Sequence, residues 1–153
     1  MKNIGVIGIG NLYRGDDGIG PKLVRKLKEK PFPPNILFFD IGLKEMNLLH
    51  ILKGLDSVLI IDAVDFDGDL GEFRFFEMDE VDSIREISGS HGSNLFKIIE
   101  LSKKMREAPD EIIIMGIKPG NMELGDEMSD ELLENIGTYL ESIEERMKDM
   151  NSG

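Results

Sequence analysis

The 153-residue sequence contains no cysteine and only two histidines, His50 and His91. The absence of cysteine excludes disulfide bonds, thiolate nucleophiles and zinc-finger sites, because each of these needs a sulfur atom from the protein. Carboxylates and the two histidines are therefore the strong metal ligands that remain. Any metal bound by this chain is held by oxygen and imidazole nitrogen.

Positive charge and long apolar runs are also scarce. The chain has 18 basic against 30 acidic side chains, a net charge of -12. Such a charge repels polyphosphate and anionic lipid, so neither nucleic acid nor a membrane is an expected partner. No apolar run approaches the ~20 residues that cross a bilayer. The first apolar run leads into glycine, arginine and paired aspartates instead of a cleavage site of small residues, which predicts a cytoplasmic protein.

The composition is that of an ordinary folded domain. The hydrophobic fraction of 41% and the charged fraction of 31% lie near globular averages. No repeat, low-complexity tract or linker interrupts the sequence. We therefore expect residues 1–153 to form a single domain, monomeric when free.

Short apolar runs alternate with segments of helical period, and this alternation is typical of βαβ units. Four runs are apolar almost throughout, as strands buried on both faces are, and they lie at residues 3–9, 35–39, 57–62 and 111–116. Residues 72–77 have strand composition but too short a connection for a helical crossover, so we expect that strand to pair antiparallel. Apolar stripes predict helices over residues 19–27, 46–54, 95–105 and 132–147, the last with Ser129 as N-cap. These elements predict a three-layer α/β/α fold with a mostly parallel five-stranded sheet, of the phosphorylase/hydrolase-like kind.

Acidic residues follow three of the predicted strands. Ligands of open α/β sheets bind at the carboxyl ends of the strands. Asp16 and Asp17 follow the first strand, Asp40 the second and Asp62 the third. A carboxylate that directly follows a buried strand must be paired, hydrogen-bonded or metal-bound, which makes Asp62 a candidate site residue. Adjacent aspartates do not comfortably face one ion, so we expect one of Asp16 and Asp17 to cap the helix that follows.

Other motifs have simpler explanations. The Gly8-x-Gly10 loop has Tyr13 where a dinucleotide fingerprint has its third glycine, so that pattern fails. The acidic stretch at residues 65–72 lacks the glycine and glutamate of a calcium loop and is interpreted as a solvated turn. His50 lies in a helical apolar pattern and is interpreted as a packed or surface histidine. His91 is flanked by small residues in a loop before a helix, where it is accessible as a ligand.

Four motifs occur in register along the chain. They are Gly-x-Gly-Asn from Gly8, followed after four residues by Asp-Asp-Gly-x-Gly; the aspartate Asp62; Ser-His-x-x-x-Leu from Ser90; and Gly-Ile-x-Pro from Gly116. Together they resemble the hydrogenase maturation proteases, and the resemblance extends from Gly8 to about Ser129. It implies a nickel-binding set of Asp17, Asp62 and His91. The family's Asp-Gly-Gly motif is Asp40-Ile41-Gly42 here, which leaves Asp40 as a recognition or catalytic residue.

The resemblance implies an activity: a nickel-dependent endopeptidase that removes the C-terminal extension of a [NiFe]-hydrogenase large-subunit precursor after nickel insertion. A shell of carboxylates and imidazole binds nickel more weakly than thiolates do, so we expect the substrate to present the metal. Zinc or cadmium could occupy the same place. The alternative is a noncatalytic nickel carrier or checkpoint protein for hydrogenase assembly.

The sequence leaves the mechanism open. Without cysteine, and without a serine paired by pattern to a histidine, attack by water is the expected route. Either the metal activates that water and polarises the carbonyl, or it positions the substrate while Asp40 or Asp62 acts as the base.

Overall fold

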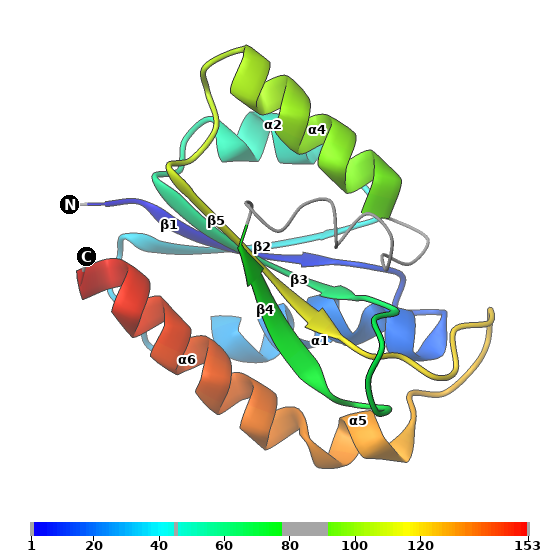
Figure 1. The fold of residues 1–153 in the computed structure, drawn as a ribbon. Helices are drawn as coiled ribbons and strands as arrows, with labels where there is room; N and C mark the ends of the chain where they lie inside the picture. The colour runs from blue at the N-terminus through cyan, green and yellow to red at the C-terminus, as the bar shows by residue number, and fades with distance from the viewer. Residues whose placement is uncertain (1, 45, 78–91, 153) are drawn as a thin grey trace.

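A five-stranded sheet forms the middle of the molecule, in the order β2-β1-β3-β5-β4 (Figure 1). The computed structural model describes residues 2–44, 46–77 and 92–152. The strands are β1 (Ile4–Ile9), β2 (Ile36–Gly42), β3 (Ser57–Ala63), β4 (Phe73–Glu77) and β5 (Glu111–Ile117). Four of them run parallel, and β4 pairs antiparallel with β5. The predicted sheet is confirmed, including its one antiparallel strand.

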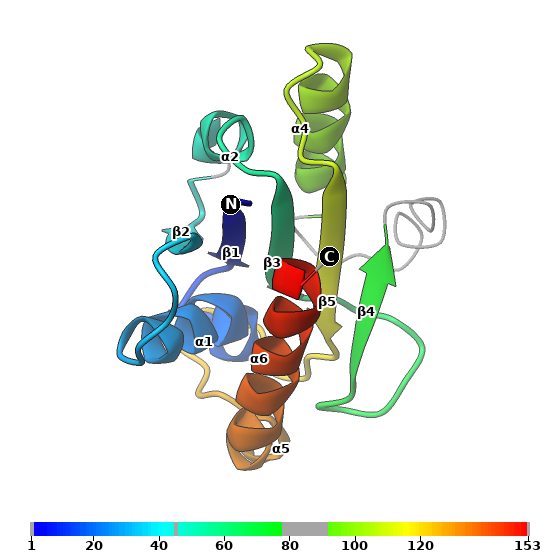
Figure 2. The same cartoon turned by 90° about the vertical axis from the view of Figure 1, so that its left-hand side faces the viewer.

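Helices cover both faces of the sheet, as the α/β/α prediction requires (Figure 2). The helices α1 (Ile19–Lys28), α5 (Asp130–Glu134) and α6 (Ile136–Ser152) lie on one face. The helices α2 (Met46–Leu52) and α4 (Gly92–Lys104) lie on the other. Strands β1 and β3 are buried along their whole length, because their side chains pack against helices on both sides. Within the described residues, no helix combines the length and apolar character needed to cross a membrane.

Helix α1 packs close to the sheet, and Gly20 makes this approach possible. A Cβ atom on Gly20 would lie 2.3 Å from the carbonyl oxygen of Ile61 and 2.8 Å from that of Ile9. Gly10 has a φ of +141°, and a Cβ atom there would lie 1.9 Å from the carbonyl oxygen of Asp17. Gly20 therefore lets α1 pack closely on β1 and β3, and Gly10 lets the loop after β1 pass the backbone of Asp17.

The last predicted helix differs from the structure. Its apolar stripe predicts one helix from the Ser129 cap to Met147, but the structure has two helices separated at Asn135. Ser129 does occupy the N-cap position of α5, yet its side chain makes no capping hydrogen bond. Its hydroxyl instead donates to the carboxylate of Asp16 at 2.5 Å, in a charge-assisted hydrogen bond.

Candidate active site

The loops that follow β1, β2 and β3 meet at the carboxyl edge of the sheet, where the sequence predicts the site. Asp17 lies there in a short 3-10 helix, η1 (Gly15–Gly18), and its side chain is only 3% exposed. The backbone amide of Asn11 donates to its Oδ2 atom at 3.0 Å, which fixes the orientation of the carboxylate. Helix η1 contacts β3, and Gly20 packs against Ile61, the neighbour of Asp62. Asp17 therefore lies beside the end of β3.

Asp62 is the sixth residue of β3 and is 3% exposed. The strand continues one residue beyond the predicted end, to Ala63, and Asp62 pairs in register with Gly116 of β5. Side chains alternate along a strand, so Asp62 lies on the same face as Val58 and Ile60, which pack with α2 and α4. The structure thus brings Asp17 and Asp62 to one edge, both as buried carboxylates.

Asp40 lies on the opposite face. It pairs with Gly8 in the register of β1 and β2, and Arg25 of α1 donates from Nε to its Oδ2 atom at 2.6 Å. Since β1 separates β2 from β3, Asp40 and Asp62 stand on strands about 10 Å apart, two strand spacings. The two predicted catalytic carboxylates are therefore not a facing pair.

A groove of about 440 Å³ runs beside Asp40. The loops after β1 and β2 form its two walls, and α1 closes one end. Its lining includes Tyr13, Leu43, Asp40 and two cations, Arg25 and Lys44. This groove has the size and the polar groups to take a short extended peptide.

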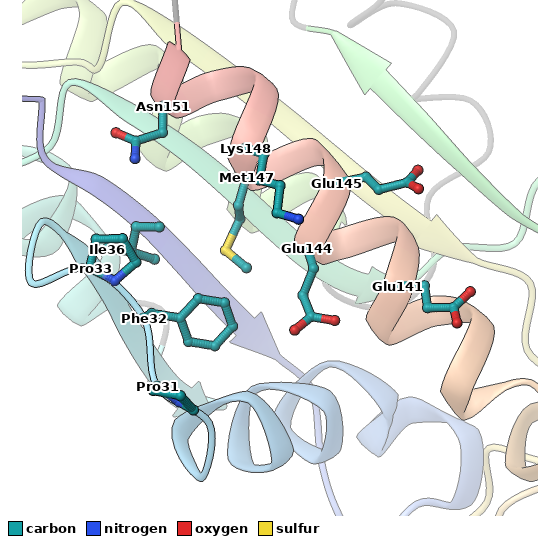
Figure 3. Close-up of a pocket in the computed structure, with 10 residues that line it drawn as sticks. All are labelled: Pro31, Phe32, Pro33, Ile36, Glu141, Glu144, Glu145, Met147, Lys148 and Asn151. Carbon is teal, nitrogen blue, oxygen red and sulfur yellow. The ribbon is translucent and has the colours of Figure 1, made fainter.

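A second hollow, of about 490 Å³, lies beside Ile36, the first residue of β2 (Figure 3). It opens between the chain leading into β2 and helix α6, with Phe32, Ile36 and Met147 in its wall. Its rim is acidic, and Glu144 pairs with Lys30 at 3.5 Å. None of the predicted site residues lines it, so we place the site at the carboxyl edge.

The prediction that Asp16 or Asp17 caps the following helix is wrong. Gly18 stands at the N-cap of α1, and no side chain there makes a capping hydrogen bond. Both aspartates lie earlier, in η1, and that turn directs Asp16 toward the loop after β5. The fully buried Asp16 accepts hydrogen bonds from Gly120 N at 2.8 Å and Asn121 N at 3.1 Å. It also accepts from Ser129, through the amide at 2.7 Å and the hydroxyl at 2.5 Å.

Only one of the two histidines, His50, lies within the described residues. His91 lies outside the described residues, directly before the first residue of α4, and its role stays a prediction. His50 is exposed on α2, consistent with a surface position. Across residues 2–44, 46–77 and 92–152, no three His, Asp or Glu side chains are grouped to hold a metal. The predicted set of Asp17, Asp62 and His91 includes one residue outside these ranges.

Comparison with known proteins decides the family. The sequence model described as hydrogenase maturation protease matches residues 21–146. The chain belongs to this family. The protease is 29% identical over 155 residues to a Methanocaldococcus jannaschii protein whose name places it in the same family, covering 93% of this chain and 94% of that one. It is 27% identical to the hydrogenase expression/formation protein HoxM of Azotobacter vinelandii, over 79% of this chain, and spans 60% of the length of that relative.

Solved structures agree with the assignment. The [NiFe] hydrogenase maturation protease HycI of Thermococcus kodakarensis superposes with a TM-score of 0.79 at 29% identity, over 96% of this chain and 93% of that one. The hydrogenase maturating endopeptidase HybD of E. coli superposes with a TM-score of 0.88 at 23% identity, over 98% and 94%, and shows the shared fold. The protease is thus a hydrolase, an endopeptidase of hydrogenase maturation. A noncatalytic carrier does not fit this membership.

Sequence patterns missed two features of the protease site. The Arg25–Asp40 pair joins residues 15 positions apart, on a helix and on a strand, and no local pattern reports it. The hydrogen bonds of Asp16 join residues more than 100 positions apart. The one sequence signal for the Asp16 hydrogen bonds was Ser129, which donates two of them and lies at the end of the stretch that resembles the family.

Proposed function

We propose that the protease removes the C-terminal extension of a [NiFe]-hydrogenase large-subunit precursor after nickel has been inserted. One observation carries the proposal: two buried carboxylates, Asp17 and Asp62, both lie at the carboxyl edge of the sheet, with α4 beginning on the face of Asp62. Family membership supplies the reaction class, and these carboxylates supply the means of sensing a cation in the substrate.

Nickel enters this proposal as part of the substrate. Asp17, Asp62 and His91 would complete its coordination while the precursor still holds it. Carboxylate and imidazole ligands bind nickel less strongly than thiolates, so the protease can contact the metal without removing it. The Asn11 amide holds Asp17 in place before any metal arrives, which lowers the entropic cost of binding. Zinc or cadmium would fit the same ligands.

The reaction is hydrolysis of one peptide bond. A water molecule attacks the carbonyl carbon, a carboxylate accepts its proton, and the C–N bond breaks as the proton passes to the leaving amine. The geometry favours separate roles for the two candidate bases. Asp62, buried at the carboxyl edge, suits contact with the metal and the water, whereas Asp40, paired with Arg25 in the groove, suits recognition of the peptide.

The test compares nickel-loaded with nickel-free precursor, with release of the extension followed by mass spectrometry. We expect cleavage of the loaded precursor only, and a loss of more than about 100-fold in Asp17→Asn, Asp62→Asn and His91→Ala. Asp110→Asn, an exposed carboxylate at the amino end of β5, is the matched control and should cleave normally. Equal cleavage of both precursors, or full activity in all three site variants, would refute the proposal.

A further inference from the structure

Large apolar side chains are exposed around the carboxyl edge. Tyr13 is 77% exposed, Met46 79%, Leu124 71%, Leu43 52% and Leu12 38%. We call these five residues the apolar edge. They are half of the ten large apolar side chains exposed among the described residues. Exposed apolar side chains gathered in one region mark an interaction surface more often than scattered ones do.

The residues of the apolar edge come from the chain after β1, β2 and β5, and hydrogen bonds hold these segments to one another. The amide of Gly125 donates to the carbonyl oxygen of Tyr13 at 2.8 Å, and that of Asp16 donates to Asn121 at 2.7 Å. The amide of Gly10 donates to the carbonyl oxygen of Gly42 at 3.0 Å. A surface fixed in this way loses little conformational entropy when it is covered.

The apolar edge extends beyond the groove beside Asp40. Leu12, Tyr13 and Leu43 line that groove, but Met46 and Leu124 do not. A short peptide lying in the groove would leave those two side chains in water. A partner that covers the groove together with Met46 and Leu124 must have a broad surface. A folded protein has one, since a stable protein interface buries about 800 Å² on each partner.

We infer that the apolar edge docks the folded body of the protein substrate, while the segment to be cut lies in the groove. The inference rests on the proposed function, which puts the cleavage site at this edge. The occupant is the substrate and not a second copy of this chain, because covering the edge with a copy would close the groove and bury the approach to Asp17 and Asp62.

The experiment uses two double variants of the full-length protein. Met46→Ser/Leu124→Ser removes the two apolar side chains outside the groove. Leu101→Ser/Met105→Ser is the control, since both side chains are exposed, at 45% and 47%, and lie in α4 and directly after it. All four positions are exposed, so the urea midpoint should stay close to wild type in both variants.

With nickel-loaded precursor, Met46→Ser/Leu124→Ser should raise KM about tenfold or more with kcat within about twofold. The control should leave both constants within about twofold. If wild type cleaves the precursor and Met46→Ser/Leu124→Ser does so with unchanged KM, the inference is wrong and the proposed function stands.

If wild type does not cleave, the proposed function fails, and direct binding then tests the inference by itself. Titration calorimetry of each protein with the precursor should show weaker binding for Met46→Ser/Leu124→Ser alone, and equal affinities would overturn the inference. Sedimentation velocity adds a second check. A wild-type dimer that Met46→Ser/Leu124→Ser dissociates would assign the edge to self-association and overturn the inference.

Discussion

Removal of the Asp16 carboxylate should destabilise the protease more than removal of any exposed acid. The side chain is fully buried and accepts four hydrogen bonds, all from the segment between β5 and α5. A hydrogen bond to a charged group contributes about 1.5–3 kcal/mol, and each buried donor left without a partner costs about 1–3 kcal/mol. These values are not additive, so we expect Asp16→Ala to lower the free energy of unfolding by about 4 kcal/mol.

Urea unfolding followed by circular dichroism measures this effect. With a urea slope of about 2 kcal/mol per molar, a loss of 4 kcal/mol moves the midpoint by about 2 M. Ser129→Ala removes only the hydroxyl donor and should lose about 1–2 kcal/mol. Asp126→Ala is the control, because that exposed carboxylate accepts a local bond from Glu123 N and should lose less than about 1 kcal/mol.

The test is the order in which the three variants lose free energy of unfolding. If Asp16→Ala loses no more than Asp126→Ala, the carboxylate does not hold the two segments together and the reasoning is wrong. A second readout follows from chain proximity. Asp17 is the next residue in η1, so Asp16→Ala should also reduce kcat for precursor cleavage under conditions where the variant remains folded.

Three further predictions concern pH, packing and the groove. Burial, and secondly the negative charge of Asp16, raise the pKa of Tyr139 from its usual 10.0 to about 12. The pKa is higher in the folded than in the unfolded state, so the stability contributed by the neutral phenol is complete below pH 10 and is lost as pH rises toward 12. The urea midpoint of the wild type should therefore decrease across that range. The decrease should be smaller in Tyr139→Phe. Gly20→Ala should lower the free energy of unfolding, measured in urea, by about 1–3 kcal/mol, because the added Cβ atom would meet backbone oxygens of β1 and β3. Gly137→Ala is the control and should not lower it, because the space around Gly137 is open. Arg25→Gln should change stability by less than about 1 kcal/mol, because Arg25 is 60% exposed, yet should raise KM for the precursor; an unchanged KM would remove Arg25 from the groove's function.

The strands were predictable because burial on both faces leaves a continuous apolar run, as Val58 to Ile61 shows. The break at Asn135 was not, since the apolar stripe continues through it: Leu132 and Ile143 both pack in the same core. At the break, the side-chain amide of Asn135 donates to the carbonyl oxygen of Glu131 at 2.6 Å, and the spacing of apolar residues does not report such a bond.

The residues of the site also differ in how far the sequence could predict them. Asp62 could be identified from position alone, because a carboxylate that ends an apolar strand is exceptional. The roles of Asp16 and Asp17 could not be separated by local rules, because their directions depend on η1 and on partners such as Gly120, over 100 residues away. His91 remains a prediction from resemblance.

The placement of Asp40 and Asp62 on opposite faces of the sheet has a consequence for how this enzyme can diversify. If Asp62 contacts the metal and Asp40 the peptide, the two requirements on a substrate are read by side chains that share no packing environment. Substitutions along α1 and the β2 loop can then alter which precursor is accepted without disturbing the carboxylates that sense its metal. Transplanting the groove residues of one such protease onto another should exchange their substrates while the nickel requirement is retained.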